Sequence, residues 1–90
     1  MKKDLSEDEI RASIIDKLDR RGKWGGCTQN KDLLEKDIMS KLKHDGKVVN
    51  KIIENMIKNQ ELILGKSGHV ISLNPRISYQ LRKFRDENLP

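Results

Sequence analysis

The sequence predicts a small α+β domain that is mostly α. Apolar residues recur at helical spacing in four separate segments of the chain. Two short β-prone runs, 62–64 and 69–73, lie between the third and fourth of these segments. A chain of 90 residues has room for one modest core. We therefore expect residues 1–90 to form a single domain.

The first helix is expected over residues 7–20. Ser6 and Glu9 have the spacing of a capping box, in which each residue bonds to the other's backbone N–H. Gly22 follows as a natural end of the helix. The face expected to be buried is apolar at helical spacing and consists of Ile10, Ile14, Ile15 and Leu18.

Three glycines within residues 22–26 predict a loop, because glycine disfavours a stable helix. We expect a very short strand at 27–28 and a second helix over 30–43. The residues that can cap this helix are Thr28, Gln29 and Asn30. Its apolar face is expected to contain Leu33, Leu34, Ile38 and Leu42.

A third helix, over 47–59, has the strongest period in the chain and follows a turn at 44–46, where Gly46 is expected to supply a positive φ. The side chains expected to face inward are Val49, Ile52, Ile53, Met56 and Ile57. The opposite face carries Lys47, Asn50, Lys51, Glu54 and Lys58.

The rest of the chain predicts a hairpin and a last helix. A hairpin is expected over 62–73, with a glycine-containing tip at 66–68. Asn74 and Pro75 have the types that cap and open a helix, which we expect over 75–86. Its apolar stripe consists of Ile77, Leu81 and Phe84. This stripe either folds back onto the first helix or forms a homodimer with a second copy.

This order of elements is that of a winged helix-turn-helix domain, with a three-helix core, a β-hairpin wing and a C-terminal fourth helix. The helices at 30–43 and 47–59 would form the helix-turn-helix unit. In that arrangement the second of them is the recognition helix, which enters the DNA major groove.

Two motifs also resemble a group of small archaeal winged-helix proteins. They are Arg20-Arg21-Gly22-Lys23-Trp24-Gly25-Gly26 and Ser72-Leu73-Asn74-Pro75-Arg76. The resemblance covers about residues 10–77 and implies a winged-helix fold. Those proteins have a presumed DNA-binding role, so the resemblance implies a similar role here.

The charge pattern favours double-stranded DNA as the partner. The net charge is +5, and residues 21–31 contain three cations and no acid. Lysines suit phosphate contact, whereas Asn50 can read adenine. We expect a transcriptional regulator or chromatin-associated protein. The expected contact residues are Thr28, Gln29, Asn30, Lys31, Lys47, Asn50, Lys51, Glu54, Lys58, Lys66, Ser67 and His69.

An alternative is a winged-helix module that binds another protein within a larger assembly. Glu54 fits this alternative slightly better, since a carboxylate in the middle of the recognition face repels phosphates. Trp24 also has two interpretations. It either stacks on a base or, as we expect, packs over the edge of the core with its N–H bonded to the backbone.

Other classes find little support in the sequence. The possible soft metal ligands, Cys27, His44 and His69, lack the paired spacing of a zinc site, so we expect no metal and no cofactor. Cys27 is expected to be a small buried residue. No catalytic motif is present, which predicts a protein that is not an enzyme. No apolar run approaches the roughly 18 residues of a membrane span, and we expect a cytoplasmic location.

Overall fold

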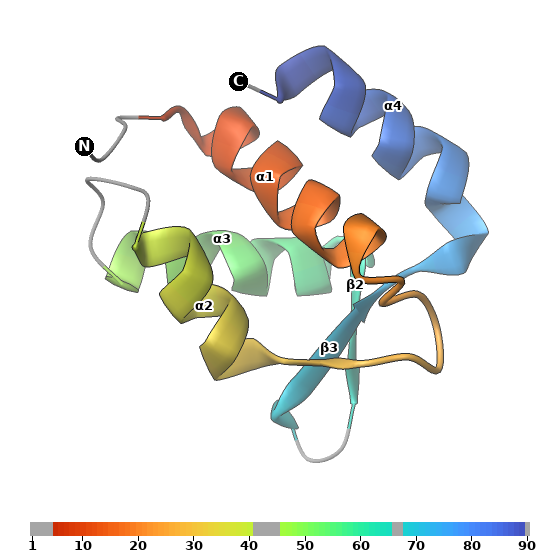
Figure 1. Cartoon of the computed structure of the whole chain (residues 1–90), viewed down its shortest axis with the longest axis horizontal. Coiled ribbons are helices and arrows are strands. Elements are labelled where there is room, and N and C mark those ends of the chain that lie inside the picture. Colours follow the sequence, from red (N-terminus) through yellow and green to blue (C-terminus); the bar gives the residue numbers. More distant parts are fainter. Residues whose placement is uncertain (1–4, 41–45, 66–67, 90) are drawn as a thin grey trace.

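A computed structural model describes residues 5–40, 46–65 and 68–89 of the chain. Within these ranges the elements, in order, are α1 (Glu7–Arg20), β1 (Gln29–Asn30), α2 (Lys31–Met39), α3 (Gly46–Lys58), β2 (Leu62–Gly65), β3 (Val70–Leu73), the 3-10 helix η2 (Pro75–Ile77) and α4 (Ser78–Asn88) (Figure 1). The prediction of an α+β domain that is mostly helical is confirmed.

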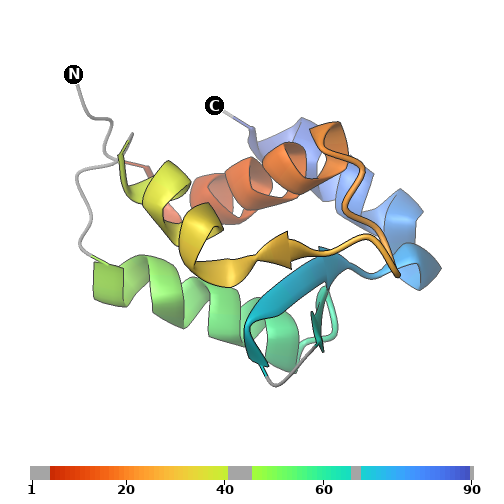
Figure 2. The same cartoon turned by 60° about the horizontal axis from the view of Figure 1, so that its bottom comes forward.

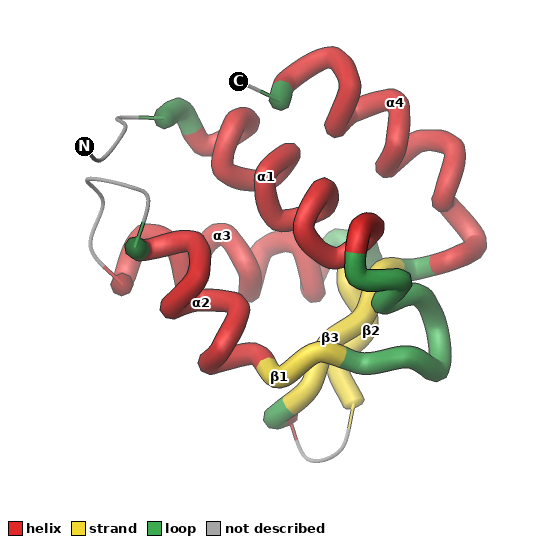
Figure 3. The backbone as a smooth tube through the Cα atoms, in the orientation of Figure 1, coloured by secondary structure: helices red, strands yellow, loops and turns green. Residues whose placement is uncertain are grey.

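The sheet is antiparallel, with strand order β1-β3-β2 (Figure 3). Leu62 lies opposite Leu73 and Gly65 opposite Val70, which confirms the hairpin predicted over 62–73. On the other edge of β3, Gln29 pairs with Ile71. The central strand of the sheet is therefore the last of the three in the sequence.

The first strand does not lie at 27–28, where it was predicted. The N–H of Cys27 donates to the carbonyl of Trp24 at 3.1 Å, which closes a turn around Gly25, whose φ is +57°. An isolated bridge joins Trp24 to Leu73 at the start of this turn, and the first strand itself begins at Gln29. The prediction of a buried Cys27 is also wrong, since the turn leaves this side chain exposed to solvent.

The core lies around α1, which packs against α3 on one side and α4 on the other (Figures 1 and 2). The capping box at Ser6 and Glu9 is present, and α1 has the predicted bounds. Four of the five inward residues predicted for α3 are buried, and Ile57 is half-buried. The side chains that fill the core are Ile10, Ile14, Ile15, Leu18, Leu34, Ile38, Val49, Ile52, Ile53, Met56, Leu62, Ile71, Leu73 and Leu81.

The second helix is shorter than predicted. It ends at Met39, and Ser40 is its C-cap, so the predicted extension fails at residue 40. Residues 41–45, with Leu42 and most of the predicted turn, lie outside the described ranges. Gly46 is the first residue of α3 and not part of a preceding turn. Leu33 is 56% exposed, because only the side chains at 34 and 38 face the core.

The end of the chain folds back onto its own first helix. Asn74 and Pro75 have the predicted capping roles, but they begin η2, and α4 starts three residues later. Leu81 is buried against the core, with Ile77 and Phe84 packed beside it. This is the first of the two arrangements that the sequence allowed, and in it the stripe lies within one chain. A homodimer through this stripe therefore has no support among the described contacts.

Candidate nucleic-acid interface

The outer face of α3 is a polar surface opposite the regular apolar face of the same helix. Val49, Ile53 and Met56 fix the rotation of the helix by facing the core. At 100° per residue, the opposite face then points to solvent. Lys47, Lys51, Glu54 and Lys58 are exposed there, and Asn50 is half-buried. The predicted recognition face is thus accessible.

The cations of this face have no bonded partner in the part of the chain that the structure describes. Among the described residues, the side chains of Lys47, Lys51 and Lys58 form no hydrogen bond or ion pair. Glu54 is the single acid among these exposed side chains. The face therefore presents a net positive charge to whatever approaches it.

The arginines behave differently from these lysines. Five of the chain's six arginines form ion pairs with carboxylates of other elements or of their own helix. The pairs are Arg11–Asp8, Arg11–Glu61, Arg20–Asp16, Arg21–Asp37, Arg82–Asp19, Arg85–Asp19 and Arg85–Asp86. Only Arg76 forms no ion pair among the described residues, and it lies on η2 and not on α3. Arginine is thus mostly engaged in ion pairs within the chain, while lysine supplies the charge of the α3 surface.

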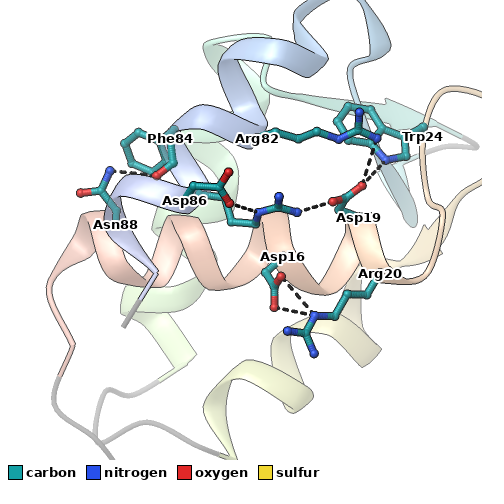
Figure 4. Close-up of polar contacts among 9 residues, drawn as sticks. Asp16, Asp19, Arg20, Trp24, Arg82, Phe84, Asp86 and Asn88 are labelled. Atoms are coloured by element: carbon teal, nitrogen blue, oxygen red, sulfur yellow. Dashed lines mark hydrogen bonds and ion pairs between the residues drawn. The ribbon is translucent and has the colours of Figure 1, made fainter.

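Asp19 is the centre of the largest of these groups, the Asp19 cluster, which also contains Trp24, Arg82 and Arg85 (Figure 4). Trp24 Nε1 donates to Asp19 Oδ1 at 3.0 Å, and Arg82 Nη2 lies 3.4 Å from the same oxygen. Arg85 pairs with Oδ2. Burial alone would raise the pKa of Asp19, but the bonds from Trp24 and Arg85 and the charge of Arg82 lower it.

Trp24 packs against the core, as predicted, but its N–H bonds to the carboxylate of Asp19 and not to the backbone. The guanidinium of Arg82 lies over its ring, 5.0 Å from the centroid. One face of the indole is therefore already covered. This arrangement does not favour the alternative in which Trp24 stacks on a base.

The polar groups at the start of α2 form hydrogen bonds mainly within the chain. Asn30 is the cap that the structure selects from the three candidates, since its Oδ1 accepts from the N–H of Leu33 at 3.1 Å. The N–H of Lys31 donates to the carbonyl of His69 at 3.0 Å. Two N–H groups of the first turn are thus unavailable to a phosphate. Thr28 is half-buried, and the side chain of Gln29 accepts from Arg21 at 3.3 Å.

The bond between Lys31 and His69 holds the hairpin beside the start of α2. The side chain of His69 is exposed. Lys66 and Ser67, the other contact residues predicted on the hairpin, lie outside the described ranges. The structure thus brings one end of the hairpin to α2, and α2 packs against α3.

Glu35 was not among the predicted site residues, yet it lies close enough to Glu54 to interact with it electrostatically. Burial is the main cause that raises the pKa of Glu35, and the negative charges of Asp32 and Glu54 raise it further against the attraction of Lys31. This neighbourhood depends on how α2 crosses α3. The sequence carried no signal for that crossing.

Two searches of the described ranges were negative. No group of three or more His, Cys, Asp or Glu side chains is arranged to hold a metal ion there. None of the helices described is long and apolar enough to cross a membrane.

Comparison of the chain with protein-family models, with curated proteins and with solved structures yields no match. The resemblance of the two motifs to small archaeal winged-helix proteins stays a prediction. Function has to be inferred from the chain's own residues.

Proposed function

We propose that this chain is a DNA-binding winged-helix protein, acting as a transcriptional regulator or a chromatin-associated protein. The observation that carries the proposal is the outer face of α3. Lys47, Lys51 and Lys58 are exposed on one face of a helix and form no ion pair among the described residues. Such a group of exposed cations can contact the phosphates of a duplex.

The arrangement of elements supports the same proposal. Helices α2 and α3 pack together, and the β2–β3 hairpin follows α3 directly. This is compatible with a helix-turn-helix unit followed by a wing. We take α3 as the helix that enters the major groove, with the hairpin beside it on the DNA.

Binding would work mainly through phosphates. Lysine ammonium groups contact phosphates as point charges and carry little sequence information. Arginine, the residue that most often reads guanine, is absent from α3. Asn50 is an amide on this face that can read adenine. The mechanism breaks no covalent bond and needs no cofactor, in keeping with a protein that is not an enzyme.

The test is fluorescence anisotropy with a labelled random-sequence duplex and its matching single strand. Salt is titrated from about 50 to 200 mM, the range over which phosphate-driven binding collapses. We expect duplex preference with a steep salt dependence. The double variant Lys47→Glu/Lys51→Glu should lose this binding, because both substitutions place carboxylates against phosphates.

The matched control is Arg76→Glu/Lys83→Glu, which makes the same change of net charge on η2 and α4. Both side chains are exposed, and neither forms an ion pair among the described residues. The control should keep most of its duplex affinity. Equal losses in the two double variants would show that net charge, and not the α3 face, controls binding.

One observation favours a second candidate, a module that binds another protein within a larger assembly. Glu54 lies on the α3 face with Glu35 beside it, so the surface is not uniformly positive. A protein surface with mixed charges would complement it. Under this alternative, duplex binding is weak at the lowest salt, and the α3 double variant leaves it unchanged.

A further inference from the structure

Glu54 is the feature of the α3 face that phosphate binding does not explain. Its side chain is exposed, with Lys51 three residues before it and Lys58 four residues after it. Both spacings allow an ion pair on a helix. Among the described residues, however, Glu54 forms no ion pair or hydrogen bond, so its carboxylate oxygens are free to accept from a ligand.

The position of this carboxylate is unfavourable for binding phosphates. Glu54 interacts with the like charge of Glu35 on α2 and lies on the face that would approach phosphates. A negative charge on this face weakens its attraction to an anion. A neutral side chain would serve better if the face only bound phosphates. A hydrogen-bond donor, which a phosphate does not provide, is therefore the partner that suits the Glu54 carboxylate.

Base edges in the major groove provide such a contact. Asn50 and Glu54 are four residues apart and share one face of α3. The lysines on either side supply the attraction to the backbone, which brings this part of the helix to the groove. Cytosine presents its N4 amino group there as a donor, whereas adenine presents the N7 acceptor beside its amino donor. A carboxylate fits cytosine better, because adenine N7 would repel it.

We infer that Glu54 is a specificity-determining residue that accepts a hydrogen bond from the amino group of a cytosine in the major groove. This inference rests on the proposed function, since it requires α3 to lie in the groove. Its contribution is to selectivity and not to overall affinity. Glu54 repels every duplex through its charge and regains that loss only where a cytosine faces it.

The test is selection from a pool of random duplexes by the whole chain and by Glu54→Gln. We expect the unaltered protein to enrich cytosine at one position by about tenfold, within the range of single-base discrimination. Glutamine pairs with adenine N6 and N7. Glu54→Gln should therefore move the preference at that position to adenine and bind the unselected pool more tightly than the unaltered protein.

Glu87→Gln is the control, because it removes one exposed carboxylate from α4 and makes the same change of charge. It should leave the selected bases unchanged. Fluorescence of the single tryptophan, Trp24, verifies that each variant is folded.

The outcomes separate this inference from the proposed function. If the unaltered protein and Glu54→Gln select the same bases, or if neither selects any, Glu54 does not determine specificity and DNA binding stands. If no variant binds duplex at the lowest salt, the proposed function fails, and the inference fails with it.

Discussion

Asp19 of α1 and Arg85 of α4 form an ion pair whose two side chains are only 17% and 18% exposed. The same carboxylate accepts from Trp24 in the loop after α1 and pairs with Arg82 one turn before Arg85. A single side chain thus joins α1, the glycine-rich loop and α4 (Figure 4). The C-terminal helix is attached to the core by this polar contact as well as by Leu81.

Asp19→Asn should destabilise the fold by about 2 kcal/mol, because it removes the carboxylate that Arg82 and Arg85 share and leaves the largely buried Arg85 with Asp86 as its one remaining described ion-pair partner. Urea denaturation followed by Trp24 fluorescence measures this loss. Asp16→Asn is the matched control on the same helix. Its partner Arg20 is 75% exposed, and such surface pairs contribute only about 0–1 kcal/mol. Similar losses in both variants would contradict a special role for Asp19.

Acid should remove the contribution of Asp19. Because the pKa of Asp19 is lowered from 3.8 in the folded protein, its stabilisation is present above pH 3.8 and is lost as the pH falls through the folded pKa. The difference in unfolding free energy between the unaltered protein and Asp19→Asn should therefore be constant from pH 7 to pH 5 and shrink below pH 3.8. A difference that persists unchanged at pH 2 would show that the charge of Asp19 is not what stabilises the fold.

Glu35 should have the opposite pH dependence. Its pKa is raised above 4.5 in the folded protein, so its contribution is fully present below pH 4.5 and is lost as the pH rises through the folded pKa. Glu35→Gln should therefore be more stable than the unaltered protein at pH 7, by about 0.5 kcal/mol, the scale of a partly exposed like-charge contact. Thermal unfolding at pH 7 and pH 4 measures the effect, which should disappear at pH 4. A variant that is less stable at pH 7 would contradict it.

Replacing one lysine of α3 should change the salt dependence of duplex binding by the amount expected for one phosphate contact. Lys51→Gln removes one phosphate contact, so the slope of log K against log salt should fall by about 0.9. Anisotropy titrations at four or more salt concentrations give the slope. Lys83→Gln, an exposed lysine of α4, should leave the slope unchanged. A change in affinity without a change in slope would argue against a phosphate contact by Lys51.

Local signals in the sequence were enough to predict most of the fold. The capping box at Ser6 and Glu9 and the period of α3 depend on residues within one or two turns, so their outcome is decided locally. The predictions were wrong where a contact between residues far apart in the sequence determines the local structure. The first strand begins at Gln29 because β3, some forty residues later, offers Ile71 as its partner. The exposure of Leu33 likewise depends on the packing of α2 and not on its own pattern.

The candidate site was predictable in part for the same reason. Which side chains of α3 face solvent follows from its period, so the exposure of Lys47, Lys51 and Lys58 could be expected. Whether each charged side chain forms an ion pair could not be predicted from the sequence. Nothing in the sequence pairs Asp19 with Arg85, or brings Glu35 of α2 to Glu54 of α3. Those contacts appear only when the helices are packed.

Most of the arginines form ion pairs within the chain, whereas the lysines of α3 are exposed, and this difference has a chemical consequence. Acetylation acts on the primary amines of lysine, neutralises them and leaves guanidinium groups intact. On this chain it would erase the positive charge of Lys47, Lys51 and Lys58 while the Asp19 cluster keeps every one of its bonds. Covalent modification can therefore weaken the attraction to an anionic partner without changing the stability of the fold.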